Sequence, residues 1–225
     1  MNTYSKTLNI SDYEWLKEEI KIIDNTQLRL TSSLSTLNPG PCFYGHSHRR
    51  WEYGLVLKAL RENKVKTVLD VGGFASIFPA CAIQLGMDVT IVDPAIDNLI
   101  EIEKKVLKQN SMRYLQQDFF SYNPNQKFDA VCAISVLEHI PNDVGFFKKM
   151  LEFVETGGLV CLTFDFFPSG DIRTPGHIRT YNYDVLNAFL LNVNNFESCG
   201  EVDYTWRGED VFNYTFASLI IRKKY

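Results

Sequence analysis

Short apolar runs alternate with helical segments from Lys66 onward, and this alternation constrains the fold more than any other feature of the sequence. The pattern predicts strands at 67–72, 88–93, 112–117, 128–135 and 157–166. It predicts helices at 76–86, 95–109 and 142–158. Strands that alternate with helices form a parallel sheet with helices on both faces. The centre of the chain therefore predicts an α/β fold.

The C-terminal part adds two more strands to this sheet. A helix is predicted at 183–192, followed by strands at 198–206 and 214–222. The linker between these two strands, RGEDVFN, is short enough to join an antiparallel pair. We therefore predict a seven-stranded, mostly parallel sheet with an antiparallel last strand and helices on both faces.

The N-terminal part is predicted to be helical. One helix is expected at 11–30, where Ser11 and Glu14 have the spacing of a capping box, and a second at about 50–61. Residues 1–62 are interpreted as a helical arm or lid, and residues 63–225 as the α/β domain. The alternative for the second helix is that it simply packs on the sheet.

The composition is that of an ordinary globular protein. Of the 225 residues, 45% are hydrophobic and 22% are charged, and the net charge of −4 disfavours a nucleic-acid partner. No signal-peptide pattern and no run of about 18 apolar residues is present, so no membrane partner is expected. The five cysteines form no C-x-x-C pair, which fits a reducing compartment. We expect a cytoplasmic protein; its oligomeric state is not predicted.

The first strand and its loop carry the functional prediction, because open parallel sheets bind ligands beyond the carboxyl ends of their strands. Gly72 and Gly73 allow a tight turn and a close approach to a ligand, and Asp70 is placed to brace the loop. Asp93 lies 21 residues beyond Gly72, near the spacing at which an acid accepts bonds from a ribose. Asp118 follows the third strand, where a carboxylate can accept a bond from an adenine amino group.

These motifs, taken together, resemble the class I (Rossmann-like) S-adenosylmethionine-dependent methyltransferases over Thr67–Phe166. The resemblance rests on the order of VLDVG, IVD, QQDFF, FDAVCAISVLEHI and GGLVCLTF. Phe74 and Ser76 replace two glycines of the usual loop. The S-x-F-P run at 76–79 and the W-E-Y run at 51–53 are similar to a subgroup that modifies glycans or small metabolites.

The resemblance implies S-adenosyl-L-methionine as cofactor and an oxygen or nitrogen of a small metabolite or sugar as methyl acceptor. The residues that it implies for cofactor binding are Asp70, Gly72, Gly73, Asp93, Pro94, Asp118, Phe119 and Ser135. The run at 135–138 reads Ser-Val-Leu-Glu, unlike the tetrad with which nucleic-acid methyltransferases hold a flipped base, so base methylation is not expected.

The acceptor side is predicted from loops at the same end of the sheet. His177 and His139 are the candidate catalytic residues, although a structural hydrogen bond is an alternative role for His139. The candidate substrate-binding residues are Tyr53, Asp165, Arg173 and Arg179. The two arginines are suited to grip a carboxylate or phosphate, and the alternative is that solvent surrounds them.

Other functions stay open from the sequence. His46 and His48 alternate, but no third ligand follows at metal-site spacing, so no metal is expected. One alternative is a non-catalytic binding protein on a degenerate methyltransferase fold. A second is a nicotinamide-dependent oxidoreductase, although the G-x-G-x-x-G fingerprint of that class is absent.

Overall fold

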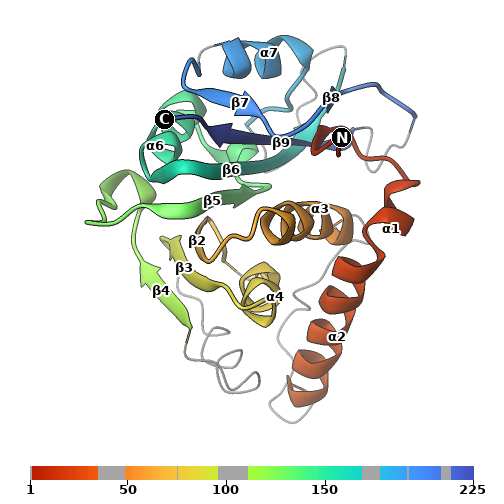
Figure 1. The fold of residues 1–225 in the computed structure, drawn as a ribbon, viewed down its shortest axis with the longest axis vertical. Coiled ribbons are helices and arrows are strands. Elements are labelled where there is room, and N and C mark those ends of the chain that lie inside the picture. Colours follow the sequence, from red (N-terminus) through yellow and green to blue (C-terminus); the bar gives the residue numbers. More distant parts are fainter. Residues whose placement is uncertain are drawn as a thin grey trace.

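Seven strands form the central sheet among the residues that the computed structural model describes, namely 2–34, 49–74, 76–95, 111–168, 178–191, 193–208 and 214–225. The strands are β2 Thr67–Val71, β3 Asp88–Asp93, β4 Met112–Gln116, β5 Phe128–Ile134, β6 Val154–Phe166, β7 Phe196–Ser198 and β9 Thr215–Lys223. Their order across the sheet is β4-β3-β2-β5-β6-β9-β7 (Figure 1).

The strand directions confirm the predicted sheet. Strands β4, β3, β2, β5 and β6 pair in parallel, whereas β9 runs antiparallel to both of its neighbours, β6 and β7. Val71 pairs with Val92, and Asp93 pairs with Gln116. Because parallel strands end at the same side of a sheet, the carboxyl ends of β2, β3 and β4 come together there.

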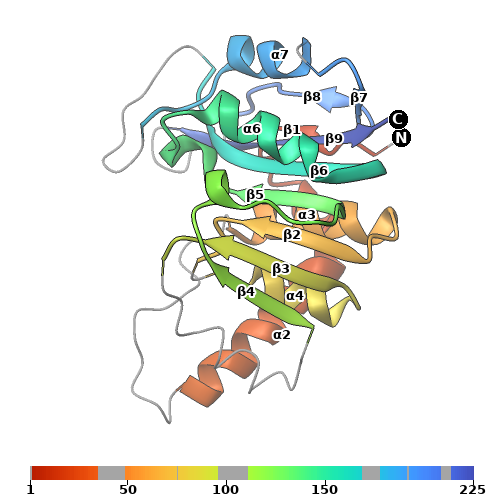
Figure 2. The ribbon, with the colours of Figure 1, turned by 90° about the vertical axis from the view of Figure 1, so that its left-hand side faces the viewer.

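Helices cover both faces of the sheet, as predicted (Figures 1 and 2). Helices α3 Arg49–Glu62 and α4 Phe78–Gln84 pack on one face, and α2 Lys17–Leu34 lies across them. Helices α6 Asp143–Glu152 and α7 Tyr183–Leu191 lie on the other face. The predicted helix at 95–109 lies outside the described residues, apart from Ala95.

Helix α3 is an integral part of the core. Its side chains Trp51, Leu55, Leu57 and Leu60 are fully buried and share one hydrophobic cluster with Phe78 of α4. Burial of this many large apolar side chains contributes several kcal/mol, at about 1.5–3 kcal/mol each. The second predicted N-terminal helix is therefore present and packs on the sheet domain.

Two predicted boundaries are wrong. The helix expected at 142–158 ends at Glu152, because Val154 already pairs with Phe128 and begins β6. The strand expected at 198–206 is divided into β7 and β8 (Val202–Asp203). Gly200 lies between them at φ 90, a left-handed conformation that ends a strand.

The predicted capping box at Ser11 is also wrong. Ser11 has helical backbone angles, and its side chain makes no capping hydrogen bond to the short helix α1, Asp12–Trp15. Its hydroxyl and its backbone N–H both donate to the side-chain oxygen of Asn9 instead, at 2.7 and 2.9 Å. The long helix α2 begins only at Lys17.

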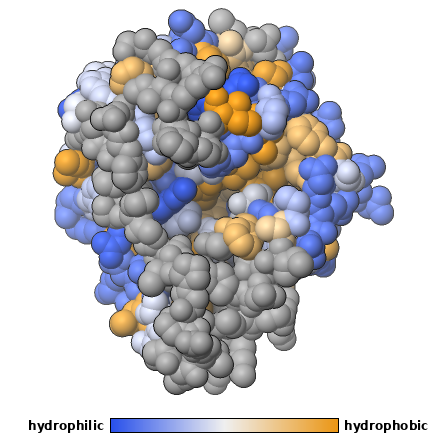
Figure 3. Space-filling model, turned by 180° about the vertical axis from the view of Figure 1, so that it is seen from behind, coloured by the Kyte–Doolittle hydropathy of each residue, from blue (hydrophilic) through white to orange (hydrophobic). Residues whose placement is uncertain are grey.

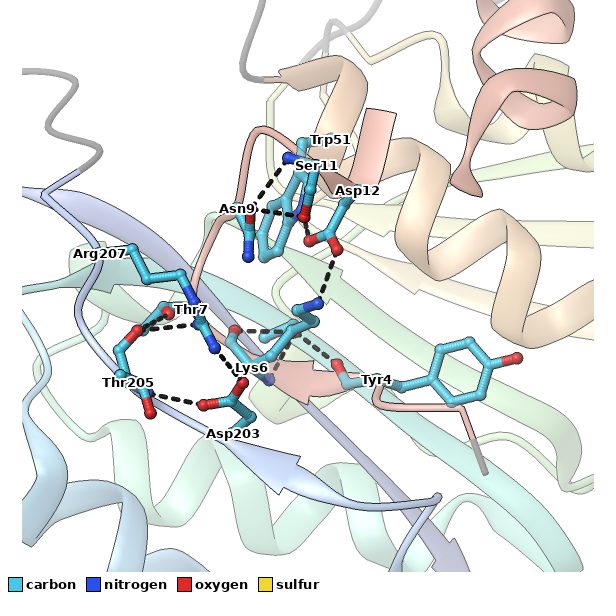
Figure 4. Close-up of polar contacts among 11 residues, drawn as sticks. Tyr4, Lys6, Thr7, Asn9, Ser11, Asp12, Trp51, Asp203, Thr205 and Arg207 are labelled. Carbon is cyan, nitrogen blue, oxygen red and sulfur yellow. Dashed lines mark hydrogen bonds and ion pairs between the residues drawn. The ribbon is translucent and has the colours of Figure 1, made fainter. Parts of the chain in front are cut away.

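A buried ion pair within the N-terminal segment, together with a hydrogen bond from Trp51, fastens this segment to helix α3 (Figure 4). Strand β1, Ser5–Lys6, pairs with β8, and the Lys6 ammonium donates to Asp12 Oδ1 at 2.7 Å. The other carboxylate oxygen of Asp12 accepts a hydrogen bond from Trp51 Nε1 at 2.9 Å. All three residues are buried, so this contact fixes where the N-terminal segment crosses the core.

Replacing Trp51 with phenylalanine tests that contact. The ring still fills the core, but Asp12 loses one of its two donors while it stays buried. A hydrogen bond to a charged group is worth about 1.5–3 kcal/mol, so we expect the free energy of unfolding to fall by about 2 kcal/mol. Urea unfolding followed by circular dichroism measures this, with Trp15→Phe, on partly buried α1, as the matched control. An equal loss in both variants would contradict a specific role for the Asp12 bond.

Among the described residues, no helix combines the length and the apolar character that crossing a bilayer requires.

Candidate active site

A pocket of about 390 Å³ opens at the carboxyl edge of the sheet, beyond the ends of β2, β3 and β5. Figure 3 looks onto this edge and shows a hollow with hydrophobic atoms along its sides. We call it the edge pocket. Six of the eight predicted cofactor-binding residues line it: Gly72, Asp93, Pro94, Asp118, Phe119 and Ser135.

The glycine loop needs its glycines for two different reasons. Gly72 has φ 76, and a side chain there would meet Val136 at 2.6 Å. Gly73 has no such angle, but a Cβ would lie 2.2 Å from Asp70 Oδ2 and 2.9 Å from Ile91. The loop therefore packs tightly on the sheet even though Phe74 and Ser76 replace two glycines of the usual pattern.

Asp70, which we predicted to brace this loop, lies under it against Gly73. It is buried, and its Oδ2 atom has no hydrogen-bond partner among the described residues. Burial, together with the nearby Asp93 carboxylate, raises the pKa of Asp70 to about 8. Asp93 contacts this loop as well, through the backbone of Phe74.

Asp93 ends β3 and organises the backbone on two sides of the pocket. Its Oδ2 atom accepts a hydrogen bond from the Phe74 N–H at 3.1 Å, and its Oδ1 atom accepts one from the Ala95 N–H at 2.8 Å. A carboxylate oxygen has two lone pairs, so each oxygen retains capacity for a ligand hydroxyl. Asp93 thus both fixes the loop and faces the pocket.

Aromatic side chains form another wall of the edge pocket. Phe119 is buried in the short helix η1, Phe119–Ser121, and its ring lies 4.8 Å from that of Phe146. Phe74 and Phe120 also line the pocket and are 48% and 43% exposed, so apolar surface is available to a flat ligand. Asp118 is exposed directly before η1, at the mouth of the pocket.

Ser135 ends β5 and connects the pocket to helix α3. It has φ 50, an uncommon conformation for a residue other than glycine, and its hydroxyl donates to Glu52 Oε1 at 2.6 Å. The Thr163 hydroxyl of β6 donates to the same oxygen at 2.6 Å. Glu52 Oε2 accepts from Arg49 at 3.0 Å. Glu52 is fully buried, and we did not predict it as a site residue, because its only signal in the sequence is its place in the W-E-Y run.

Two further acids join Glu52 at this end of the sheet, and we call the three the acidic cluster: Glu52, Glu138 and Asp165. Glu138 is in the short helix η2, Leu137–His139, and is buried; Asp165 is near the end of β6 and is also buried. Burial and the neighbouring Asp165 raise the pKa of Glu138 well above its ordinary value. Burial and Glu52 raise the pKa of Asp165 to about 7, against the opposing charge of Arg49.

The other predicted site residues lie in several places. His139 is exposed and lines the edge pocket. Tyr53 is buried, accepts a hydrogen bond from the Ser76 hydroxyl at 3.2 Å, and has its pKa raised by burial to about 12. Arg179 is held by Asp143 of α6 at 2.9 Å, so its guanidinium is already paired. Arg173 and His177 lie outside the described residues.

Metal ligation was not expected, and among the described residues no group of three or more histidine, cysteine, aspartate or glutamate side chains is arranged to hold a metal ion.

Comparison with known proteins gives this architecture a family. The family model described as "Methyltransferase domain" matches residues 45–186. The mitochondrial ubiquinone biosynthesis O-methyltransferase of Dictyostelium discoideum is 26% identical over 109 residues, which cover 43% of this chain and 34% of that protein. The corresponding enzyme of Rickettsia canadensis is 26% identical over 98 residues, 43% of this chain and 41% of its own. The chain thus spans less than half the length of these relatives.

Solved structures share the fold over more of the chain. The 1,6-didemethyltoxoflavin-N1-methyltransferase of Burkholderia thailandensis superposes with a TM-score of 0.66 at 16% identity, over 88% of each chain. The N-methyltransferase NodS of Bradyrhizobium japonicum, bound to S-adenosylhomocysteine, superposes with a TM-score of 0.60 at 13% identity, over 87% of this chain and 98% of its own. At such identities the likeness establishes the fold.

Proposed function

The chain belongs to the methyltransferase-domain family, and we propose that it transfers a methyl group from S-adenosyl-L-methionine to an oxygen or nitrogen of a small metabolite or sugar. The observation that carries this proposal is the edge pocket, where residues from the ends of β2, β3 and β5 gather around one space. The residues predicted to bind the cofactor lie far apart in the sequence, and six of the eight line this one cavity.

Each part of the cofactor has a matching part of the pocket in this proposal. Asp93 accepts hydrogen bonds from the ribose hydroxyls, since its oxygens retain free lone pairs. Asp118 and Phe119 frame the adenine, with Phe120 as a further apolar surface. Gly72 approaches the methionine part of the cofactor, and Ser135 lies beside the methyl group that is transferred. Asp70 and Gly73 support the glycine loop. Pro94 lies beside the ribose.

Methyl transfer from a sulfonium is a direct displacement, so the protein mainly has to align the acceptor, the methyl carbon and the sulfur. A general base is needed where the acceptor must lose a proton. His139, which lines the edge pocket, stays a predicted catalytic residue, and Asp165, whose pKa is raised to about 7 by burial and by Glu52, is a further candidate. His177, Arg173 and Tyr53 stay as predicted contributors to the acceptor side.

The N-terminal residues and the cellular setting belong to the same proposal. Residues 1–62 act as a cover for the active site, supported by the contacts of Glu52 and Tyr53 with Ser135 and Ser76. A cytoplasmic location is supported by Cys81, Cys132, Cys161 and Cys199, which are free thiols buried in the described structure. We propose a small-molecule partner and no nucleic acid.

Replacing Asp93 with alanine tests the proposed cofactor site. Two backbone bonds and the ribose contacts are lost, so we expect the affinity for S-adenosylhomocysteine to fall by about 2 kcal/mol or more, roughly thirtyfold. Isothermal titration calorimetry measures this. Asp88→Ala, at the exposed opposite end of β3, is the matched control and should bind like the original protein. Absence of binding to the unmodified protein at millimolar ligand, or unchanged affinity in Asp93→Ala, would reject the proposal.

A further inference from the structure

We propose that Lys149 of α6 is a positioning residue for the cofactor. Its ammonium holds η1 in place, and η1 carries Phe119 and Phe120, which we call the adenine wall. This inference rests on the proposed function, because it needs S-adenosyl-L-methionine in the edge pocket. It goes further by giving a role to a side chain that is not part of the described lining of that pocket.

The adenine wall stands on a short connection between two strands. Strands β4 and β5 are separated in the sheet by β3 and β2, so the chain between them crosses three strand spacings, about 14 Å. It does so within residues 117–127, and η1 is the one regular element in this fully described stretch. A helix of three residues has too few internal hydrogen bonds to be stable by itself. The position of η1 therefore depends on the element against which it packs.

Helix α6 is that element. Phe146, Lys149 and Phe153 lie three and four residues apart at α6, so their side chains form one stripe along the helix. The Phe119 ring lies 4.8 Å from the Phe146 ring and 5.9 Å from the Phe153 ring. The Phe120 ring lies 6.1 Å from that of Phe146. The two aromatic members of the stripe thus hold the rings of the adenine wall.

Lys149 adds a polar contact from the same stripe to the backbone of η1. Its ammonium donates a hydrogen bond to the carbonyl oxygen of Phe120 at 2.6 Å. The same nitrogen lies 5.6 Å from the centroid of the Phe119 ring and 5.5 Å from that of Phe153, where a cation is attracted to an aromatic face. A hydrogen bond from a charged donor is short and directional, so it fixes η1 at one height along α6.

The contact lies behind the adenine wall. Phe119 and Phe120 line the edge pocket, and Asp118, the proposed acceptor for the adenine amino group, directly precedes η1 as its N-cap. A shift of η1 along α6 would therefore move the aromatic surface and the carboxylate together. Loss of the Lys149 ammonium should weaken cofactor binding even though no group that touches the cofactor is removed.

Replacing Lys149 with methionine tests this inference, because methionine keeps a long unbranched side chain and lacks the ammonium. We expect the dissociation constant of S-adenosylhomocysteine, measured by calorimetry, to rise about fivefold or more. Lys149→Arg keeps the charge and the donors, so its affinity should stay within about twofold of that of the unmodified protein. Lys148→Met is the matched control. Lys148 is the next residue of α6, is exposed and lines a different cavity, so this variant should bind like the unmodified protein.

Hydrogen exchange followed by mass spectrometry separates positioning from a general loss of stability, because local opening and global unfolding expose different sets of amides. The measurement uses protein saturated with S-adenosylhomocysteine. In Lys149→Met we expect the amides of residues 118–122 to exchange faster than in the unmodified complex. The amides of residues 68–74, in β2 and the glycine loop, should keep their protection.

The outcomes distinguish this inference from the proposed function. If the unmodified protein does not bind S-adenosylhomocysteine at millimolar concentration, the proposed function fails. If it binds, and Lys149→Met binds as tightly, only the inference fails. The inference also fails if Lys149→Arg loses as much affinity as Lys149→Met, because the ammonium would then not be the group that matters. Equal acceleration of exchange in residues 118–122 and 68–74 would assign Lys149 to overall stability and overturn the positioning role.

Discussion

Replacing Glu52 with alanine is expected to lower the free energy of unfolding by about 3 kcal/mol and to abolish methyl transfer. Glu52 is fully buried and joins three elements, since it accepts bonds from Arg49 in α3, Ser135 after β5 and Thr163 in β6. Removing one partner of a buried ion pair costs about 3–5 kcal/mol because the other charge and the hydroxyls are left without it.

Two features of the site reduce that cost to the lower end of the range. Arg49 is 34% exposed at its side chain, so water partly replaces the lost carboxylate. The negative charge of Glu52 also contributes to the raised pKa of Asp165, so its removal relieves some repulsion within the acidic cluster. Activity is expected to suffer more than stability, because Ser135 at φ 50 loses the contact that holds its hydroxyl.

Urea unfolding and a labelled-methyl transfer assay measure the two effects of Glu52→Ala. Glu14→Ala is the matched control, since the Glu14–Lys17 pair has the same i,i+3 spacing but both side chains are exposed. We expect that control to leave the free energy of unfolding nearly unchanged, because water screens an exposed pair. Equal losses in both variants would show that the Glu52 network has no special role.

The sheet was predictable because its strands are short apolar runs bounded by turns. VLDV at 68–71 and TIVD at 90–93 each read as a buried strand, and both form where expected. The helix and strand boundaries that were predicted wrongly depend on contacts with residues far away in the sequence. Residues 153–156 continue a helical pattern in sequence, but the pairing of Val154 with Phe128 overrides it. Local propensity does not contain that contact.

Some residues of the candidate site could be predicted from the sequence and others could not. Asp93 follows a strand at a spacing set by the fold, so sequence reasoning found it and the structure places it on the edge pocket. Glu52 was not predicted as a site residue because its partners Ser135 and Thr163 lie 83 and 111 residues away in the chain. Arg179 looked available for a substrate, and only the fold shows its ion pair with Asp143. Contacts of this kind need the tertiary structure.

Replacing Asp70 with asparagine is expected to stabilise the ligand-free protein, and to do so more at high pH. The pKa of Asp70 is raised to about 8 in the folded protein, through burial first and the Asp93 carboxylate second. An aspartate in an unfolded chain titrates near pH 3.9. Between these two values the folded state holds a proton that the unfolded state has released, so this residue lowers stability as the pH rises through that window.

The size of the effect follows from the same two values. Each pKa unit is worth about 1.4 kcal/mol, so Asp70 costs up to about 2 kcal/mol at pH 5 and up to about 5 kcal/mol at pH 8. An asparagine of similar shape carries no charge at either pH. The gain from Asp70→Asn, measured by urea unfolding, should therefore be larger at pH 8 than at pH 5. Asp88→Asn, exposed on the neighbouring strand, should change stability little at both.

A buried acid that destabilises its own protein is expected where it serves a ligand, because functional sites keep groups that a purely structural core would lose. Asp70 lies under Gly73 beside the edge pocket, where the proposed cofactor carries a positive sulfonium and an amino group. Asp70→Asn should therefore gain stability and at the same time bind S-adenosylmethionine more weakly, by about tenfold in calorimetry. A gain in stability without any loss of affinity would assign Asp70 to the fold alone. If Asp70→Asn instead lowers the free energy of unfolding equally at pH 5 and at pH 8, the carboxyl group of Asp70 is needed as an ionised partner.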